Sequence, residues 1–249
     1  RRPVMLLFQH TEAHVIGIDI GVNYIMGVLT DLNGNIIKER KQPTMTSDYD
    51  EALEIIMDLI RSLISSAPES MYGVVGIGLA VPGTVDMDGE LLLAPNLNWK
   101  HKQLKQDIHD AFNLPVMIEN EANAGAFAEK QIGSGQSAND MVYISAGIGI
   151  GVGMILRDEL YRGSGGFAGE MGHMIIQYDG LPCSCGSKGC WELYASEMAL
   201  IKKASTTLSP NEEWTLEKLI DQASSEEQIQ TIFSETAKYL GIGIASIAN

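Results

Sequence analysis

One pattern occurs twice in this chain and constrains the fold more than any other feature: an apolar strand, a glycine turn and a second apolar strand. Its letters are VIGIDIGVNYIMGVLT at residues 15–30 and MVYISAGIGIGVGMIL at residues 141–156. Short apolar runs rich in valine and isoleucine and broken by glycine are typical of paired strands. Because helical segments separate the two copies, the sequence predicts an α/β fold with a duplicated architecture and a cleft between two lobes. We place the N-terminal lobe at residues 1–119 and the C-terminal lobe at residues 120–249.

The other elements follow from hydrophobic periodicity and from turn residues. Residues 48–64 carry apolar side chains at helical spacing, and Asp48 with Glu51 forms a predicted capping box at the start of that helix. The dipeptide Pro82-Gly83 marks a turn after a buried strand. The further predicted strands cover residues 36–41, 73–80 and 115–118, and the further predicted helices cover residues 101–111, 121–131, 214–221 and 226–247.

Composition limits the classes of function. The 249 residues, 45% of them hydrophobic and 20% charged, can form one large or two modest domains with a substantial core. The formal net charge of −15 repels nucleic-acid phosphates, so we expect no DNA binding by this chain itself. No apolar run reaches the roughly 20 residues that cross a bilayer, and the first residues lack a secretory signal. We therefore expect a cytoplasmic protein without a membrane partner.

The three cysteines of the chain lie together in the segment CSCGSKGC, as Cys183, Cys185 and Cys190. An odd number of cysteines so close together in a cytoplasmic chain points to a metal before a disulfide. The glycines let a short loop place three thiolates around one ion, and zinc is the ion that such a set favours. Structural zinc takes four ligands, and His173 is the nearest histidine upstream. The alternative is a loop with three unliganded thiols.

Polar side chains of a kind that binds sugar hydroxyls stand at the ends of predicted elements. Asn120 and Glu121 follow a strand and begin a helix, Glu170 and His173 lie in GEMGH, and Glu192 lies in CWEL. Each also has a simpler interpretation. Glu121 can be an acidic residue that favours a helix start, Glu170 a solvated carboxylate, and His173 a metal ligand alone.

Two glycine-rich turns, at residues 17–21 and 147–153, can each cradle a phosphate through backbone N–H groups. They can equally be tight turns between strands. Neither matches the Walker A pattern, because no Gly-Lys-Ser/Thr follows the glycines.

The order of these motifs resembles the ROK family of repressors, uncharacterised frames and sugar kinases, from about residue 14 to 249. The matching segments are GIDIG, VPG, ENEANAGA, SAGIGIGVG, GEMGH and CSCGSKGCWE. The resemblance implies an actin-like (ribonuclease H-like) two-lobed fold with a sugar in the cleft and a structural zinc bracing one wall. It also implies sugar contacts from a set of six residues and a zinc site of four. The sugar set is Gly83, Asn120, Glu121, Glu170, His173 and Glu192, and the zinc set is His173, Cys183, Cys185 and Cys190.

Repressors of this family begin with a winged helix-turn-helix, and the opening RRPVML resembles the stretch that follows it. We therefore expect operator DNA to be bound only through a domain that this sequence lacks. A homodimer is expected, because repressors pair to contact two half-sites. Family members also continue beyond the position of Asn249 with a further strand and helix.

The resemblance leaves two activities to compare, a sugar sensor and an ATP-dependent sugar kinase. Kinases of the family use an aspartate as general base where this chain has Glu121, and a misplacement of about 1 Å can cost roughly 100-fold in rate. The kinases also carry Gly-Gly-Thr and Gly-Thr-Gly in the two turns, where Val22, Asn23 and Ile148 stand here. These differences favour a non-catalytic sensor, with the kinase as the alternative.

The segment NEANAGA is most similar to the corresponding segment in the xylose-repressor branch of the family. The expected effector is thus an aldose of the xylose or glucose type. A scaffold without any ligand is disfavoured, because the polar set is intact.

Overall fold

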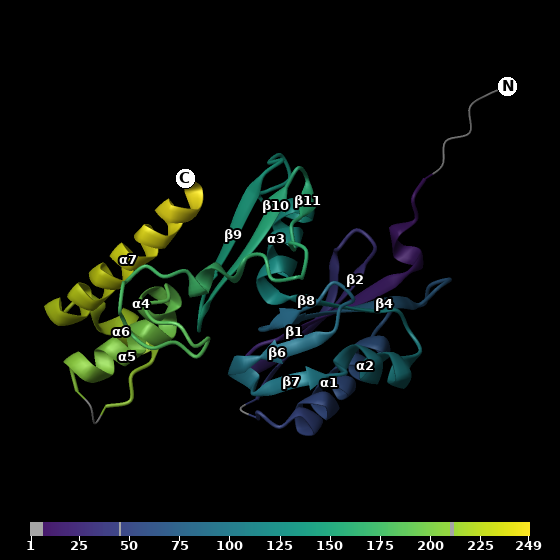
Figure 1. Cartoon of the computed structure of the whole chain (residues 1–249). Helices are drawn as coiled ribbons and strands as arrows, with labels where there is room; N and C mark the ends of the chain where they lie inside the picture. The colour runs from purple at the N-terminus through teal and green to yellow at the C-terminus, as the bar shows by residue number, and fades with distance from the viewer. Residues whose placement is uncertain (1–6, 45, 210–211) are drawn as a thin grey trace. The chain divides into compact units, whose positions relative to one another are not determined.

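The computed structural model describes residues 7–44, 46–209 and 212–249, and the chain divides into two compact units (Figure 1). Unit 1 contains the described residues up to Ala124, together with Gln131–Gln136 and Arg162–Phe167. Unit 2 contains Gly125–Lys130, Ser137–Tyr161 and Ala168–Asn249. Each unit is described by itself below.

Unit 1 is built on a five-stranded sheet with the order β3-β2-β1-β4-β8. The strands in that order are Ile36–Pro43, Tyr24–Asp31, His14–Ile20, Val74–Val81 and Val116–Asn120. The pairs β1/β2 and β2/β3 are antiparallel, whereas β1/β4 and β4/β8 are parallel. The carboxyl ends of β1, β4 and β8 therefore meet at one edge, which is where open α/β sheets bind ligands.

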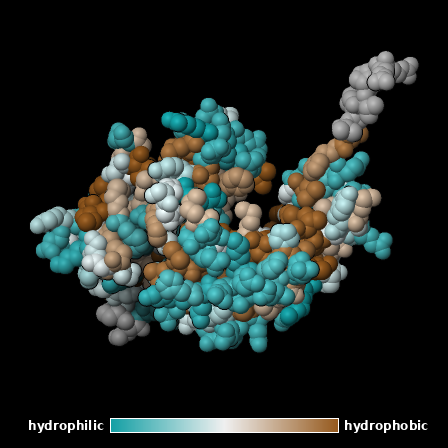
Figure 2. Space-filling view, turned by 45° about the vertical axis from the view of Figure 1, so that its right-hand side comes forward, coloured by the Kyte–Doolittle hydropathy of each residue, from teal (hydrophilic) through white to brown (hydrophobic). Residues whose placement is uncertain are grey.

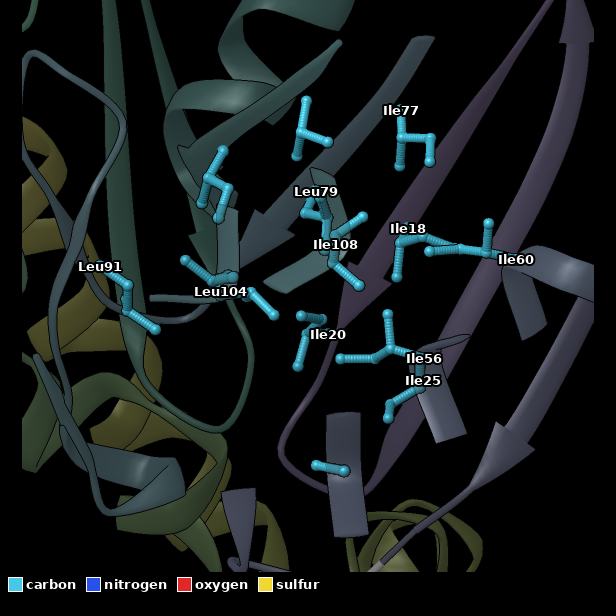
Figure 3. Close-up of a cluster of buried hydrophobic side chains, with 14 of the residues drawn as sticks. Ile18, Ile20, Ile25, Ile56, Ile60, Ile77, Leu79, Leu91, Leu104 and Ile108 are labelled. Carbon is cyan, nitrogen blue, oxygen red and sulfur yellow. The ribbon is translucent and has the colours of Figure 1, made fainter. Parts of the chain in front are cut away.

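Two helices, α1 (Tyr49–Ile64) and α2 (Leu104–Phe112), cover one face of this sheet. Every second residue of β1 is buried, and Figure 3 shows Ile18 and Ile20 of β1 pointing towards Ile56 and Ile60 of α1. These aliphatic contacts form the main core of unit 1. Each fully buried isoleucine or leucine side chain contributes about 1.5–3 kcal/mol of transfer free energy.

The capping box predicted at α1 is formed only in part. The Asp48 carboxylate accepts a 3.0 Å hydrogen bond from the N–H of Glu51, as an N-cap residue does. The reciprocal bond is absent from the described residues, because the Glu51 carboxylate accepts the Thr46 hydroxyl at 2.6 Å. The Asp48 N–H donates to that same hydroxyl oxygen at 3.1 Å.

A small antiparallel sheet in unit 1 was not predicted, and it moves the start of a helix. Its strands are β5 (Thr84–Val85), β6 (Leu91–Ala94) and β7 (Trp99–Lys102), with the 3-10 helix η2 (Pro95–Leu97) between the last two. The helix predicted over 101–111 is wrong at its N-terminal end, because Lys102 pairs with Leu91 in the sheet. Trp99 is buried and its indole N–H donates to the Ser47 carbonyl oxygen at 3.1 Å, which fixes β7 in place.

Unit 2 contains the second copy of the repeated pattern as an antiparallel sheet with the order β11-β10-β9. Both strand–turn–strand copies predicted from the sequence are therefore confirmed, as β1/β2 and β9/β10. The strands are β9 (Met141–Ala146), β10 (Ile150–Leu156) and β11 (Glu159–Leu160). The remaining elements of the chain are η1 (His10–Glu12), α3 (Glu121–Ile132), η3 (Glu170–His173), α4 (Glu192–Ala195), α5 (Glu197–Thr207), α6 (Leu216–Ala223) and α7 (Glu227–Ala248).

Side-chain caps set where the helices of unit 2 begin. Ser196 accepts from the N–H of Ala199 at the start of α5, and Thr215 accepts from the N–H of Lys218 at the start of α6. The helix predicted from residue 214 therefore begins two residues later, at Leu216. Trp214 is buried instead in a cluster with residues of α5, α6 and α7.

The surface carries both hydrophilic and hydrophobic residues. Figure 2 shows hydrophilic side chains over much of one face, with hydrophobic groups between them. Within the described ranges, none of the helices is both long enough and apolar enough to cross a membrane.

Candidate functional site

Three residues predicted to bind a sugar lie at the carboxyl edge of the unit 1 sheet. Asn120 ends β8, Glu121 begins α3, and Gly83 follows β4. The Asn120 side-chain amide donates to the Gly83 carbonyl oxygen at 2.9 Å. Its carbonyl oxygen accepts the N–H groups of Ala122 at 2.9 Å and Asn123 at 3.2 Å, which caps α3. One side chain thus joins the loop after β4 to the helix that carries Glu121.

Gly83 is required by close backbone packing. A Cβ at this position would lie 2.4 Å from the Leu93 carbonyl oxygen and 2.9 Å from the Ala94 Cα, both in β6. Only glycine lets the loop pass β6 at this distance. The small sheet that the sequence did not reveal is therefore what holds Gly83 beside Asn120.

Glu119 and Arg162 brace this edge, and sequence reasoning missed both. One Glu119 carboxylate oxygen accepts from the Asn120 N–H at 3.0 Å and from the Asn123 amide at 3.1 Å. The other oxygen lies 2.7 Å from Nε and 2.6 Å from Nη2 of Arg162, a two-point ion pair. The available signal was the acidic residue directly before the predicted pair in ENEAN. Its distant arginine partner left no signal in the sequence.

Glu121 is partly buried beside a second carboxylate. Burial raises the pKa of Glu121, and the negative charge of Asp19 near the end of β1 raises it further. A carboxylate at this edge can accept a hydrogen bond from a hydroxyl group. It can also take a proton from one, which is the chemistry of a general base.

Both glycine turns are tight strand connections in the structure. The Gly21 N–H donates to the Tyr24 carbonyl oxygen at 2.9 Å, and the Gly147 N–H donates to the Gly149 carbonyl oxygen at 3.0 Å. This is the simpler of the two interpretations that the sequence left open. These two backbone N–H groups already donate hydrogen bonds within their turns, so they are not free to bind a phosphate.

In unit 2, the spacing of GEMGH has a steric origin. A Cβ on Gly169 would lie 2.2 Å from the Val152 carbonyl oxygen, and a Cβ on Gly172 would lie 2.2 Å from that of Ile150. The two glycines therefore let the 3-10 helix η3 rest directly on the backbone of β10. Glu170 and His173 come from this same turn, so their relative positions are set by β10.

His173 and the three cysteines form the cluster that the sequence predicted. The Cys183 Sγ lies 3.5 Å from the His173 Nδ1, and the Cys185 and Cys190 Sγ atoms lie 3.6 Å apart. All four potential ligand atoms lie within 4.8 Å of one another. Zinc bonds of about 2.3 Å to sulfur and 2.0–2.1 Å to nitrogen in a tetrahedron put ligand atoms about 3.5–3.8 Å apart. The cluster thus has the donor types and spacing that fit a zinc ion.

The cysteine loop owes its shape to its glycines. Gly186 and Gly189 have φ values of +89° and +76°, which side-chain-bearing residues rarely adopt. A Cβ on Gly189 would lie 1.8 Å from the Gln177 carbonyl oxygen. The loop closes through a hydrogen bond of 2.9 Å from the Cys183 N–H to the Ser187 carbonyl oxygen. These turns bring all three thiols to one side.

The protonation of the thiols depends on their surroundings. Burial, followed by the neighbouring thiols, raises the pKa of Cys190 to about 12. A hydrogen bond from the Ser187 backbone is the main cause that lowers the pKa of Cys185. A buried thiol of this kind ionises when a cation compensates its charge, so metal binding here would release protons.

Glu192 links this cluster to the second glycine turn. Its Oε1 lies 3.2 Å from the His173 Nδ1 and accepts the Cys183 thiol at 3.4 Å. Its Oε2 lies 3.4 Å from where a Cβ on Gly149 would stand. Of the three residues predicted in unit 2 to contact a sugar, His173 and Glu192 are therefore in contact, and Glu170 shares the turn of His173.

Comparison with known proteins places this arrangement among relatives of two kinds. The chain is 45% identical over 251 residues to a xylose repressor from Bacillus spizizenii, covering 100% of this chain and 64% of that protein. This chain thus spans less than two thirds of the length of that relative. The solved ROK family glucokinase from Streptomyces griseus, in complex with glucose and AMPPNP, is 34% identical with a TM-score of 0.80. That match covers 94% of this chain and 79% of the glucokinase.

A solved ROK family transcriptional regulator, a homologue of the E. coli MLC protein, has a TM-score of 0.82 at 28% identity. The match covers 96% of this chain and 63% of the regulator. These similarities confirm the actin-like α/β fold class expected from the sequence. Repressors and kinases both occur among the relatives. The ROK family model matches residues 15–249, nearly the whole chain, and the protein therefore belongs to the ROK family.

Proposed function

We propose that this chain is the sugar-sensing part of a ROK-family transcriptional repressor, which binds an aldose without phosphorylating it. The observation that carries the proposal is the Asn120–Glu121 pair, which is held at the carboxyl edge of the sheet by the Gly83 hydrogen bond. The Glu121 carboxylate of this pair can accept hydrogen bonds from sugar hydroxyl groups. Because the glutamate side chain is one methylene longer, its carboxylate lies elsewhere than that of the catalytic aspartate in family kinases. The identity of 45% to a xylose repressor along the whole chain supports the same assignment.

The residues proposed to contact the sugar are the six predicted from the sequence, and each unit is again taken by itself. Gly83, Asn120 and Glu121 belong to unit 1, and Glu170, His173 and Glu192 belong to unit 2. Carboxylates, amides and imidazole are groups that fix the orientation of a hydroxyl-rich ligand. The division into lobes at residues 1–119 and 120–249 stays a prediction.

A structural zinc ion is part of the proposal, bound by His173, Cys183, Cys185 and Cys190. The Nδ1 atom of His173 faces the thiols, so the imidazole keeps Nε2 for a second partner. An ion bound to Nδ1 would fix the imidazole beside the Glu192 carboxylate, whose Oε1 lies 3.2 Å from that atom without the ion. The same histidine can therefore be both a zinc ligand and a sugar contact.

The proposal for the whole protein follows from its repressor relatives. Operator DNA would be bound by an N-terminal winged helix-turn-helix outside this sequence, in a cytoplasmic homodimer. The sugar would control that binding. The net charge of −15 supports the view that this chain does not itself contact DNA phosphates.

The second candidate is a sugar kinase, and one observation favours it. The pKa of Glu121 is raised, which brings this carboxyl closer to the range in which a general base works well at neutral pH. A solved relative at 34% identity is a glucokinase. The residues of the two glycine turns argue against this candidate, because Val22, Asn23 and Ile148 supply no hydroxyl group to a phosphate.

Thermal unfolding against a panel of sugars tests the sensor proposal. A ligand at 100 times its dissociation constant should add about 2.7 kcal/mol to the free energy of unfolding. Xylose and glucose are the first sugars to test, with an uncyclised polyol such as xylitol as the matched control. We expect one aldose to raise the melting temperature clearly. A panel in which every aldose behaves like xylitol would overturn the proposal.

A further inference from the structure

The first glycine turn of unit 1 is covered by an aromatic side chain. A Cβ on Gly21 would lie 2.5 Å from Cε1 and 2.7 Å from Cδ1 and Cζ of Tyr24. The phenol ring therefore lies directly on the backbone of the turn. The Gly21 N–H is also used, because it donates to the Tyr24 carbonyl oxygen at 2.9 Å.

The ring is held in this position by two further contacts. The Tyr24 hydroxyl donates a 2.6 Å hydrogen bond to the Asp19 carboxylate, a length typical of a strong charge-assisted bond. The Lys41 ammonium lies 4.1 Å from the centre of the ring, which is cation–π distance. Burial and the Asp19 carboxylate raise the pKa of Tyr24, so the hydroxyl remains a donor at neutral pH.

Charges of both signs lie around the ring, so its steric cover of Gly21 is what would keep an anion out of the turn. Asp19 accepts the tyrosine hydroxyl, and the Asp19 charge also acts on the Glu121 carboxyl at the same sheet edge. A phosphate entering the turn would meet an aromatic ring where a phosphate cradle needs free backbone N–H groups. An uncharged, hydroxyl-rich ligand needs no such cradle of N–H groups and can donate hydrogen bonds to the carboxylates of this edge.

We propose that Tyr24 is a specificity-determining residue, which closes the Gly21 turn to phosphate groups and reserves this edge of unit 1 for an uncharged ligand. The inference rests on the proposed function only in taking this edge as the ligand site. Beside the hydroxyl groups missing from the two turns, it gives a steric reason why a chain similar to a glucokinase solved with glucose and AMPPNP would bind a sugar but no nucleotide.

Binding of tripolyphosphate and of magnesium AMPPNP to the 249-residue chain tests the proposal by calorimetry. Tyr24→Thr uncovers Gly21 and keeps a β-branched residue at the first position of β2, where such residues favour strand structure. Tyr24→Phe is the matched control, because it keeps the ring and removes the hydroxyl. We expect Tyr24→Thr to bind tripolyphosphate at least about tenfold more tightly than the wild-type chain. Tyr24→Phe should bind it as weakly as the wild type.

A folded Tyr24→Thr chain that binds tripolyphosphate no better than the wild type would overturn the proposal. If Tyr24→Thr does not fold, Tyr24→Val serves the same purpose. The amide resonance of Gly21 in the wild type gives a measurement that needs no variant, and a saturable shift with tripolyphosphate would equally refute the closed turn. The melting temperatures with the sugar panel are a separate measurement. If no sugar changes the melting temperature of the wild type but Tyr24→Thr binds tripolyphosphate more tightly, the sensor proposal is rejected and the role of Tyr24 stands.

Discussion

The indole N–H of Trp191 donates a 2.9 Å hydrogen bond to the backbone carbonyl oxygen of Tyr239 in α7. Trp191 is fully buried and directly follows the cysteine ligand candidate Cys190. Its ring lies against Gly243, where a Cβ would stand 2.0 Å from the Cε2 atom of the indole. Helix α7 thus holds the end of the cysteine loop through one side chain.

Two glycines of α7 provide a matched test of this contact. Gly243→Ala should lower the free energy of unfolding of unit 2 by about 1–3 kcal/mol, because the added methyl group overpacks against the buried indole. Gly241→Ala, where no atom lies within 4 Å of the Cβ position, should stabilise the chain by up to about 1 kcal/mol through helix propensity. Urea unfolding measures both effects. Equal effects of the two substitutions would mean that the indole does not pack as described.

Much of the fold could be predicted from local patterns, because they record burial directly. The alternation in β1 and the helical spacing in α1 both produce buried faces that meet in one core. The small sheet β5-β6-β7 could not be predicted in this way. Its strands have two to four residues, and β7 is made of Trp99, Lys100, His101 and Lys102, which carry little apolar alternation.

The candidate site divides in the same way. The cysteine cluster was predictable because three of its ligands lie in one short loop and the fourth is a nearby histidine, so the sequence itself records their spacing. The Glu119–Arg162 ion pair and the cover that Tyr24 forms over Gly21 were not predictable. The first joins residues far apart in sequence, and the second depends on a rotamer. Neither leaves a periodic or compositional trace.

The cysteine loop should contain about one equivalent of zinc in protein purified without added metal, as measured by elemental analysis. Cys185→Ser should lower the zinc affinity by more than about 100-fold, since loss of a ligand exceeds the 10–100-fold cost of losing an outer partner. The melting temperature should fall with it, because the binding free energy of a structural ion contributes to folding.

Ser184→Ala is the control for that substitution, because Ser184 is an exposed neighbour outside the cluster. It should leave the zinc content unchanged. Wild-type protein with less than about half an equivalent of zinc would reject the ion, and an unchanged zinc content in Cys185→Ser would reject the ligand set.

Glu121→Gln should weaken sugar binding and at the same time stabilise the free protein at neutral pH. A hydrogen bond from a sugar hydroxyl to a charged acceptor contributes about 1.5–3 kcal/mol, so its loss should weaken sugar binding roughly 10–150-fold. The stabilisation arises because burial and Asp19 raise the pKa of Glu121, so its ionised form is disfavoured in the folded state. Glutamine removes that cost.

The sign of this effect gives a pH dependence. A carboxyl whose pKa is raised on folding binds protons more tightly in the folded state, so the wild type gains stability as the pH falls through the folded pKa. The advantage of Glu121→Gln should therefore be greatest at neutral pH and shrink towards about pH 4, near the pKa of an unfolded glutamate. Thermal melts of both proteins across this range measure the difference. An advantage that grows as the pH falls would show that Glu121 is not held in the environment described.

The last prediction separates a sensor from a kinase, because a kinase must consume ATP when its sugar is present. Coupled ADP-release assays with magnesium ATP, on whichever sugar raises the melting temperature, should remain at background. Glu121 reaches further than the aspartate of family kinases, and Tyr24 covers Gly21 in the first turn. Glu121→Asp should also stay at background, because restoring the carboxylate position does not uncover that turn. A ROK glucokinase assayed beside them shows that the conditions support turnover. Steady, sugar-dependent ADP production by the wild type would establish the kinase and show that the residues of the two turns matter less than their chemistry suggests.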